Sequence, residues 1–230
     1  MAPFLDYTVH IPWGVDHQIF NPRLQKRENK AMVRDWLGIP RDALIFGFSG
    51  RIVPVKNIEA IIDAFAALTE KYPEKNIYFA VFGGNREDFT DENSYSYSLL
   101  NRIQKKNINE LSEKIKFFGV YFPQTIMSAI DILVQPSFYE SWGLAVTEAM
   151  ACGIPVIVSD NPIMKEVTKN GQRYIDPSDA SSLERAMEEF LLSPDLRQEL
   201  GNNAYEDTLD YNWSNSFLTL IEHIRKFGLS

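Results

Sequence analysis

Short apolar runs and longer segments with helical spacing alternate along most of the 230-residue chain. Five runs are rich in β-branched and aromatic residues and are typical of buried strands, namely 44–48, 77–82, 115–118, 132–134 and 155–158. Between the first two runs, apolar residues recur at helical spacing from Ile58 to Leu68, and Tyr72-Pro73 ends that segment. This alternation predicts an α/β fold with a single Rossmann-like, doubly wound parallel sheet.

Two regions depart from the alternation. Residues 85–98 are polar and lack clear periodicity, so we expect a long surface insertion with little functional content. From Ser178 onward the pattern predicts only helices, and the last of them, 212–227, carries an apolar stripe of Trp213, Phe217, Leu220, Ile221 and Ile224. We therefore expect extra C-terminal helices beyond the sheet.

Composition narrows the class of protein. Hydrophobic residues make up 45% of the chain and charged residues 23%, which is typical of globular proteins and excludes disorder of the whole chain. The net charge of −8 argues against binding nucleic acid through a general basic surface. The single cysteine, Cys152, cannot form an intramolecular disulfide, and no targeting or transmembrane segment is visible. We therefore expect a cytoplasmic location.

A first candidate site follows the first strand. Ser49-Gly50-Arg51 comes directly after the strand, and Lys56 precedes the next helix. Ligands of open α/β sheets bind at the carboxyl ends of the strands, so both cations are placed to meet a phosphate. Arg51 can grip phosphate oxygens with two hydrogen bonds, and Lys56 can act as a point charge. The alternative is that both are solvated surface cations.

A second candidate site lies in residues 136–156, which read as strand, loop, helix and strand in succession. Ser141, Trp142, Gly143 and Leu144 would open the helix, so its unpaired amides and positive dipole end would face the same crevice as the two cations. The pattern thus predicts an anion site formed by Arg51, Lys56 and the start of this helix.

Two glutamates flank this helix start. Glu140 precedes the helix, and Glu148 lies inside it among small and apolar residues. Carboxylates accept hydrogen bonds from vicinal hydroxyls, so one glutamate is suited to a sugar and the other to the ribose of a nucleotide sugar. The alternative is a solvated Glu140 and a structural Glu148.

Residues 136–156 resemble the signature of retaining GT-B glycosyltransferases of family 4, in which two glutamates separated by seven residues bind the nucleotide sugar. Gly50-Arg51 with Lys56 resembles the diphosphate grip of that family, and residues 10–22 resemble its interdomain linker. Residues 117–123 resemble the segment along the nucleobase. The chain departs from the family pattern at Trp13, Asn57 and Arg173.

The resemblance implies transfer of a hexosyl group from a nucleotide diphosphate sugar, with a UDP- or GDP-sugar favoured over an ADP-sugar. It implies catalytic roles for Glu140, Arg51 and Lys56. The residues expected to bind the donor are Gly50, Gly83, Tyr121, Ser141, Trp142, Gly143, Leu144 and Glu148. We expect no cofactor and no essential metal, because the cations and the helix start can neutralise the diphosphate and the aspartates form no metal-ligand pattern.

A GT-B enzyme has two Rossmann-like domains, and the matched motifs belong to the second. We therefore expect a linker remnant at 1–22, a nucleotide-sugar-binding domain at 23–211 and a crossover helix at 212–230. The N-terminal acceptor domain would be absent or supplied by another chain, without which the chain is expected to be inactive. Nucleic acid is not an expected partner, and peripheral membrane association is expected only of the full enzyme.

Two other functions fit the same sequence. One is a non-catalytic nucleotide-sugar-binding module that acts with a partner chain, and the other is a GT-B sugar-nucleotide epimerase. Sugar transfer by the chain with a supplied acceptor domain, lost in Glu140→Ala, would favour the enzyme. Cys152 follows an apolar helix with no histidine nearby in the sequence, so we expect it to pack in the core.

Overall fold

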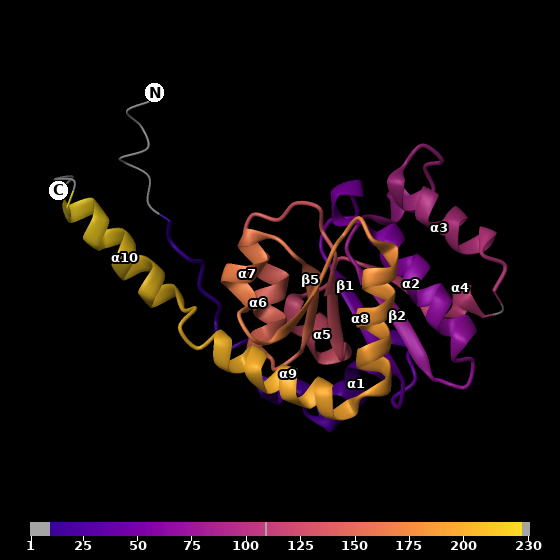
Figure 1. Cartoon of the computed structure of the whole chain (residues 1–230), viewed down its shortest axis with the longest axis horizontal. Helices are drawn as coiled ribbons and strands as arrows, with labels where there is room; N and C mark the ends of the chain where they lie inside the picture. The colour runs from indigo at the N-terminus through magenta and orange to yellow at the C-terminus, as the bar shows by residue number, and fades with distance from the viewer. Residues whose placement is uncertain (1–9, 109, 227–230) are drawn as a thin grey trace.

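The computed structural model describes residues 10–108 and 110–226. Within these residues one parallel sheet has the strand order β3-β2-β1-β4-β5-β6 (Figure 1). The strands are β1 (Leu44–Ser49), β2 (Ile77–Phe82), β3 (Ile115–Gly119), β4 (Ile132–Gln135), β5 (Val156–Ser159) and β6 (Gln172–Ile175). The predicted doubly wound sheet is confirmed, and its topological switch point lies between β1 and β4.

Helices cover both faces of the sheet. One layer contains α2 (Ile58–Lys71), α3 (Tyr95–Lys105), α4 (Leu111–Lys114) and α8 (Ala180–Leu192). The other contains α1 (Arg27–Leu37), α5 (Pro123–Ala129), α6 (Leu144–Ala151) and α7 (Pro162–Thr168). Helix α9 (Pro194–Asp207) contacts both α8 and α6 and so joins the two layers. Three short 3₁₀ helices lie in the described connections, η2 (Pro22–Gln25), η3 (Pro54–Lys56) and η4 (Arg86–Phe89).

The strands separate two apolar cores by alternation of their side chains. On β1, Phe46 and Phe48 belong to the core beneath α2 and α8, whereas Ile45 belongs to the core beneath α5 and α6. Strand β2 repeats this with Phe79 on one face and Phe82 on the other. A strand buried on both faces needs apolar residues at every position, which explains why the predicted strands are continuous apolar runs.

Two parts of the fold differ from the sequence prediction. Strand β6 was not among the predicted strands, because its polar Gln172 and Arg173 break the apolar run at the edge of the sheet. Residues 85–98 are partly helical: they contain η4 and the start of α3, whose first turn is capped when the Tyr97 amide donates to Ser94 Oγ at 3.0 Å. Phe89 also packs on Phe117, with ring centroids 5.0 Å apart, so this insertion is attached to the domain.

The last helix, α10 (Trp213–Lys226), projects from the body of the molecule beside the N-terminal end of the described chain (Figure 1). Ser216 Oγ donates to the Pro12 carbonyl at 2.6 Å, and the rings of Trp13 and Trp213 are 5.9 Å apart. No residue of α10 is buried by the rest of the described structure. The outer ends of the predicted linker and crossover helix, 1–9 and 227–230, lie outside the described residues. None of the described helices has the length and apolar character needed to cross a membrane.

Candidate functional site

A cavity of about 340 Å³ opens at the carboxyl end of the sheet, between β1 and β4. We call it the switch-point cavity. Its lining residues are Trp13, Ser49, Gly50, Arg51, Lys56, Gln135, Glu140, Ser141, Trp142, Gly143, Leu144 and Ala145. The structure therefore brings together most of the residues that the sequence singled out, including all three proposed catalytic residues.

The loop after β1 brings the two cations to this cavity. Arg51 follows the end of β1, and Lys56 closes η3. The next residue, Asn57, has φ 55° and ψ 43°, a left-handed conformation that asparagine tolerates better than most residues other than glycine. Its side-chain amide also donates to the Pro177 carbonyl at 2.9 Å. Asn57, at a position where the family pattern commonly has glycine, thus adopts a conformation that glycine adopts readily and adds a hydrogen bond.

Lys56 and Glu140 form an ion pair in the cavity, with Nζ and Oε2 2.5 Å apart and each side chain only 12% exposed. Arg51 is exposed and forms no ion pair with another described side chain. The loop after β4 is fixed to the loop after β1, because the Phe138 amide donates to the Val55 carbonyl at 2.9 Å. An anion entering the cavity would therefore meet one unpaired cation and one cation held by a carboxylate.

The start of α6 supplies the third contributor. Gly143 precedes the helix with φ 87°, and its carbonyl accepts from the amides of Val146 and Thr147 at 2.9 and 3.1 Å. The amides of Leu144 and Ala145 come before these first helical bonds, and both residues line the cavity. The positive end of the helix dipole therefore lies at the cavity, as predicted.

Trp142 lines the cavity and is also buried in the domain. Its ring packs edge-on against Tyr211 at 5.6 Å and lies 6.0 Å from the ring of His10. The indole Nε1 has no hydrogen-bond partner in the described structure. His10 in turn contacts the Glu166 carboxylate of α7 at 2.7 Å, and Trp13 lines the cavity itself, so the predicted linker lies between α7 and the cavity.

An adjoining cavity of about 220 Å³ shares Ser49, Gly50 and Arg51 with the switch-point cavity. It contains the predicted donor-binding residues Gly83 and Tyr121. The Tyr121 ring packs edge-on against three aromatic neighbours, with centroid distances of 5.2 Å to Trp36, 6.0 Å to Phe82 and 6.3 Å to Phe118. This cavity therefore offers a rigid aromatic wall beside the proposed phosphate grip.

Gly83 has a structural reason to be glycine. Its φ is 138°, and a Cβ atom there would lie 1.9 Å from the Gly50 carbonyl oxygen. The close approach that requires glycine is therefore between the loops after β1 and β2. The predicted role of Gly83 in binding the donor is therefore not needed to explain why the residue is glycine.

Glu148 is not among the residues that line the two cavities in the described part of the chain. It lies one helical turn beyond Leu144, is half-buried, and forms no ion pair with a described side chain. Burial raises the pKa of its carboxyl to about 7. Cys152, at the end of the same helix, is fully buried, and burial raises the pKa of its thiol to about 12, as fits a packing residue rather than a nucleophile.

Sequence reasoning missed Gln135 as a site residue. It ends β4, is 3% exposed, and lines the switch-point cavity. The sequence feature that could have identified it is a polar residue at the carboxyl end of an otherwise apolar strand, where ligands of such sheets bind. Among the described residues, no group of three or more histidine, cysteine, aspartate or glutamate side chains is placed to hold a metal ion.

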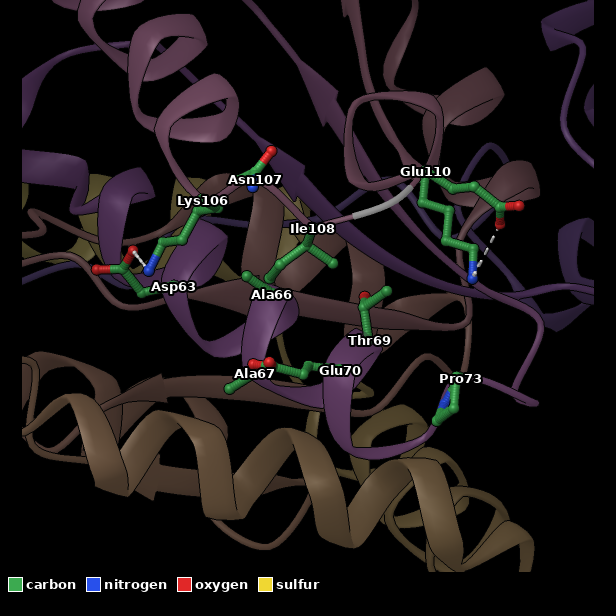
Figure 2. Close-up of a pocket in the computed structure, with 11 residues that line it drawn as sticks. Asp63, Ala66, Ala67, Thr69, Glu70, Pro73, Lys106, Asn107, Ile108 and Glu110 are labelled. Atoms are coloured by element: carbon green, nitrogen blue, oxygen red, sulfur yellow. Dashed lines mark ion pairs between the residues drawn. The ribbon is translucent and has the colours of Figure 1, made fainter.

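A larger cavity, of about 670 Å³, lies between α2 and the segment joining α3 to α4 (Figure 2). Four of its charged side chains form two pairs: Lys106 Nζ lies 2.7 Å from Asp63 Oδ1, and Lys114 Nζ lies 4.0 Å from Glu110 Oε2. No residue of the loops that follow β1 and β4 lines it. Size alone therefore does not identify the functional site here.

Comparison with known proteins relates this geometry to a family. The family model described as glycosyl transferases group 1 matches residues 30–207. D-inositol 3-phosphate glycosyltransferase of Corynebacterium jeikeium (strain K411) is 29% identical over 214 residues, which cover 90% of this chain and 48% of that protein. The chain thus spans about half the length of the curated relatives it matches.

Two solved structures show the same fold. Sucrose-phosphate synthase (tll1590) from Thermosynechococcus elongatus matches with a TM-score of 0.77 and 26% identity, over 96% of this chain and 53% of that one. Anabaena Alr3699/HepE, solved in complex with UDP and glucose, matches with a TM-score of 0.79 and 19% identity, over 93% of this chain and 55% of that one.

Proposed function

From the premise that this chain belongs to the glycosyl transferases group 1 family, we propose that it is the donor-binding domain of a retaining glycosyltransferase of family 4. The whole enzyme would transfer a hexosyl group from a nucleotide diphosphate sugar, with retention at the anomeric carbon. The observation that carries the proposal is the meeting of Arg51, Lys56, Glu140 and the start of α6 in one cavity at the switch point of the sheet.

In this proposal the diphosphate lies in the switch-point cavity. Arg51 donates to its oxygens, and the α6 amides and dipole stabilise the negative charge that develops as the glycosidic bond breaks. Lys56 leaves its pairing with Glu140, or shares it, when the diphosphate arrives, because a phosphate carries more charge than one carboxylate. Glu140 then accepts hydrogen bonds from the hydroxyls of the donor sugar.

The nucleoside occupies the adjoining cavity. Tyr121 and Phe82, which line this cavity, face the base. Glu148 lines neither cavity in the described structure, and the family resemblance is what supports it as the acceptor for the ribose hydroxyls. A UDP- or GDP-sugar is favoured over an ADP-sugar, and the complex of Anabaena Alr3699/HepE with UDP and glucose supports UDP as the first nucleotide to test. We propose residues 23–211 as the nucleotide-sugar-binding domain, with 1–22 and 212–230 as segments that connect it to an acceptor domain.

Catalysis in this proposal requires that acceptor domain. The curated relatives are about twice the length of this chain, which supports a second domain in the whole enzyme. We expect no transfer by the chain alone and transfer once an acceptor domain is supplied. Assays of the chain alone and of the chain with an acceptor domain, using UDP-glucose and GDP-mannose as donors, test this expectation.

Calorimetric titration with UDP, GDP and ADP in the presence of a chelator tests the proposed site. We expect at least one of the three to bind without metal, because the chain supplies the positive charge itself. Arg51→Ala should cost about 1.5–3 kcal/mol of binding free energy, the range for hydrogen bonds to charged groups. Arg41→Ala is the matched control, since Arg41 is an exposed arginine that precedes the amino end of β1 and pairs with Asp35. Failure of all three nucleotides to bind would contradict the proposal.

A further inference from the structure

The switch-point cavity has an unsatisfied amide in its wall. Gln135 is the last residue of β4, and only 3% of it is exposed. Its Oε1 is buried and has no hydrogen-bond partner in the described structure. A buried polar atom without a partner costs free energy, and the neighbouring positions Leu133 and Val134 show that apolar side chains are accommodated in this strand.

The location of this amide is specific. Gln135 ends β4 beside the loop that leaves β1, so it lies at the switch point of the sheet. Its Nε2 lies 3.7 Å from the point that a Cβ atom on Gly50 would occupy. The amide is therefore beside the backbone of the proposed phosphate grip, and it shares the cavity with the paired Lys56 and Glu140.

The chemistry of the amide selects between parts of the proposed ligand. Diphosphate oxygens at neutral pH only accept hydrogen bonds, so they can pair with Nε2 but leave the orphaned acceptor Oε1 without a donor. A sugar hydroxyl both donates and accepts, so it can accept from Nε2 or, after a half-turn of the last side-chain torsion, donate to Oε1. Glu140, a second acceptor in the same cavity, suits the same kind of ligand.

We propose that Gln135 hydrogen-bonds a hydroxyl of the donor sugar and thereby contributes to the choice of sugar. This inference rests on the proposed function, because it assumes that the cavity holds a nucleotide sugar. It adds a neutral amide to the charged residues: the cations and α6 hold the diphosphate, whereas Glu140 and Gln135 hold the sugar.

Calorimetry on the chain with UDP and with a panel of UDP-glucose, UDP-galactose, UDP-N-acetylglucosamine and GDP-mannose tests the inference. The variant is Gln135→Met, which keeps the length of the side chain and removes its polar atoms. We expect UDP affinity to change less than about twofold and affinity for the best nucleotide sugar to fall about three- to tenfold, the range for one neutral hydrogen bond. The melting temperature of the variant should equal or exceed that of the wild type, since a buried orphaned acceptor has been removed.

Ser137→Ala is the matched control. Ser137 is also buried, and its Oγ also lacks a partner in the described structure, but it is not among the residues that line the switch-point cavity. Its loss should leave the ratio of the two affinities unchanged. If Gln135→Met does not fold, Gln135→Leu provides the same comparison with a different apolar shape.

The outcomes separate this inference from the proposed function. A selective loss for the nucleotide sugar supports Gln135 as a sugar contact. Equal losses for UDP and the nucleotide sugar, or no loss of either, overturn that role and leave the nucleotide site in place. If the wild type binds neither UDP nor any member of the panel, both the inference and the proposed function fail.

Discussion

The two glutamates of the proposed site differ in their surroundings. Glu140 is held by Lys56, whereas Glu148 lies along α6 without an ion-pair partner among the described side chains. We predict that Glu140→Ala weakens binding of a nucleotide sugar by about tenfold and does not weaken UDP, because the substitution leaves the Lys56 ammonium free to meet the diphosphate. Glu148→Ala should weaken both ligands alike, since the ribose is common to both. Calorimetry with matched ligand pairs measures the difference, and equal losses in both variants would refute the separate roles.

The raised pKa of Glu148 predicts how stability depends on pH. The folded protein keeps the proton up to a pKa of about 7, whereas the ordinary glutamate value is 4.5. The folded state therefore binds more protons between these values, so this group lowers the free energy of unfolding as the pH rises from about 4.5 to about 7. We expect Glu148→Gln to raise the melting temperature at pH 8 and to change it little at pH 4.5.

Thermal unfolding followed by circular dichroism at both pH values measures this effect. Glu92→Gln, which removes an exposed glutamate from the surface, reports the general effect of losing one carboxylate. A Glu148→Gln shift of the same size at both pH values would show that burial of this carboxyl does not destabilise its ionised form.

At the scale of helices and strands, the sequence predicted the elements that are buried on both sides. Strands β1, β2 and β5 are continuous apolar runs, and α2 carries a full apolar stripe. Of the two edge strands, β3 was predicted because Phe117 and Phe118 continue its apolar run, whereas β6 was missed because it begins with the polar Gln172 and Arg173. The start of α3 was missed because its signal is one capping serine, Ser94, within a polar segment.

The sequence predicted the parts of the site that follow directly after strands in the chain. Arg51 and the start of α6 come directly after strands that end at the same edge, so parallel topology alone brings them together. Contacts that depend on exact packing were not predictable. Residue spacing in the sequence does not indicate that Gly83 approaches Gly50 or that Lys56 pairs with Glu140.

The close approach of Gly83 to Gly50 predicts a measurable effect on the free energy of unfolding. Gly83→Ala should lower the free energy of unfolding by more than the roughly 1 kcal/mol that a positive φ alone costs an alanine, because its Cβ would overlap the Gly50 carbonyl. Gly38→Ala is the control, since Gly38 has φ 67° but no atom within 4 Å of its Cβ position. Urea denaturation of both variants compares the losses, and equal losses would mean that the loops move apart at little cost.

For the molecule as a whole, α10 is notable because it does not pack on the sheet. It lies beside the N-terminal end of the described chain rather than over a core. Its exposed side chains include Trp213 at 52%, Phe217 at 61% and Leu220 at 42%. Exposed apolar surface of this kind favours association with another surface, and we propose the acceptor domain as its partner.

In the absence of an acceptor domain, we predict that the chain either associates through α10 or shows this helix as its least protected segment. Sedimentation velocity over a range of concentrations measures association, and hydrogen exchange compares the amides of α10 with those of β1. The double variant Phe217→Glu/Leu220→Glu should reduce any association, whereas Leu192→Glu, at an exposed position of α8, should not. A monomer at all concentrations, with α10 amides protected as well as those of β1, would mean that the helix is stable on this domain alone and needs no acceptor half to cover it.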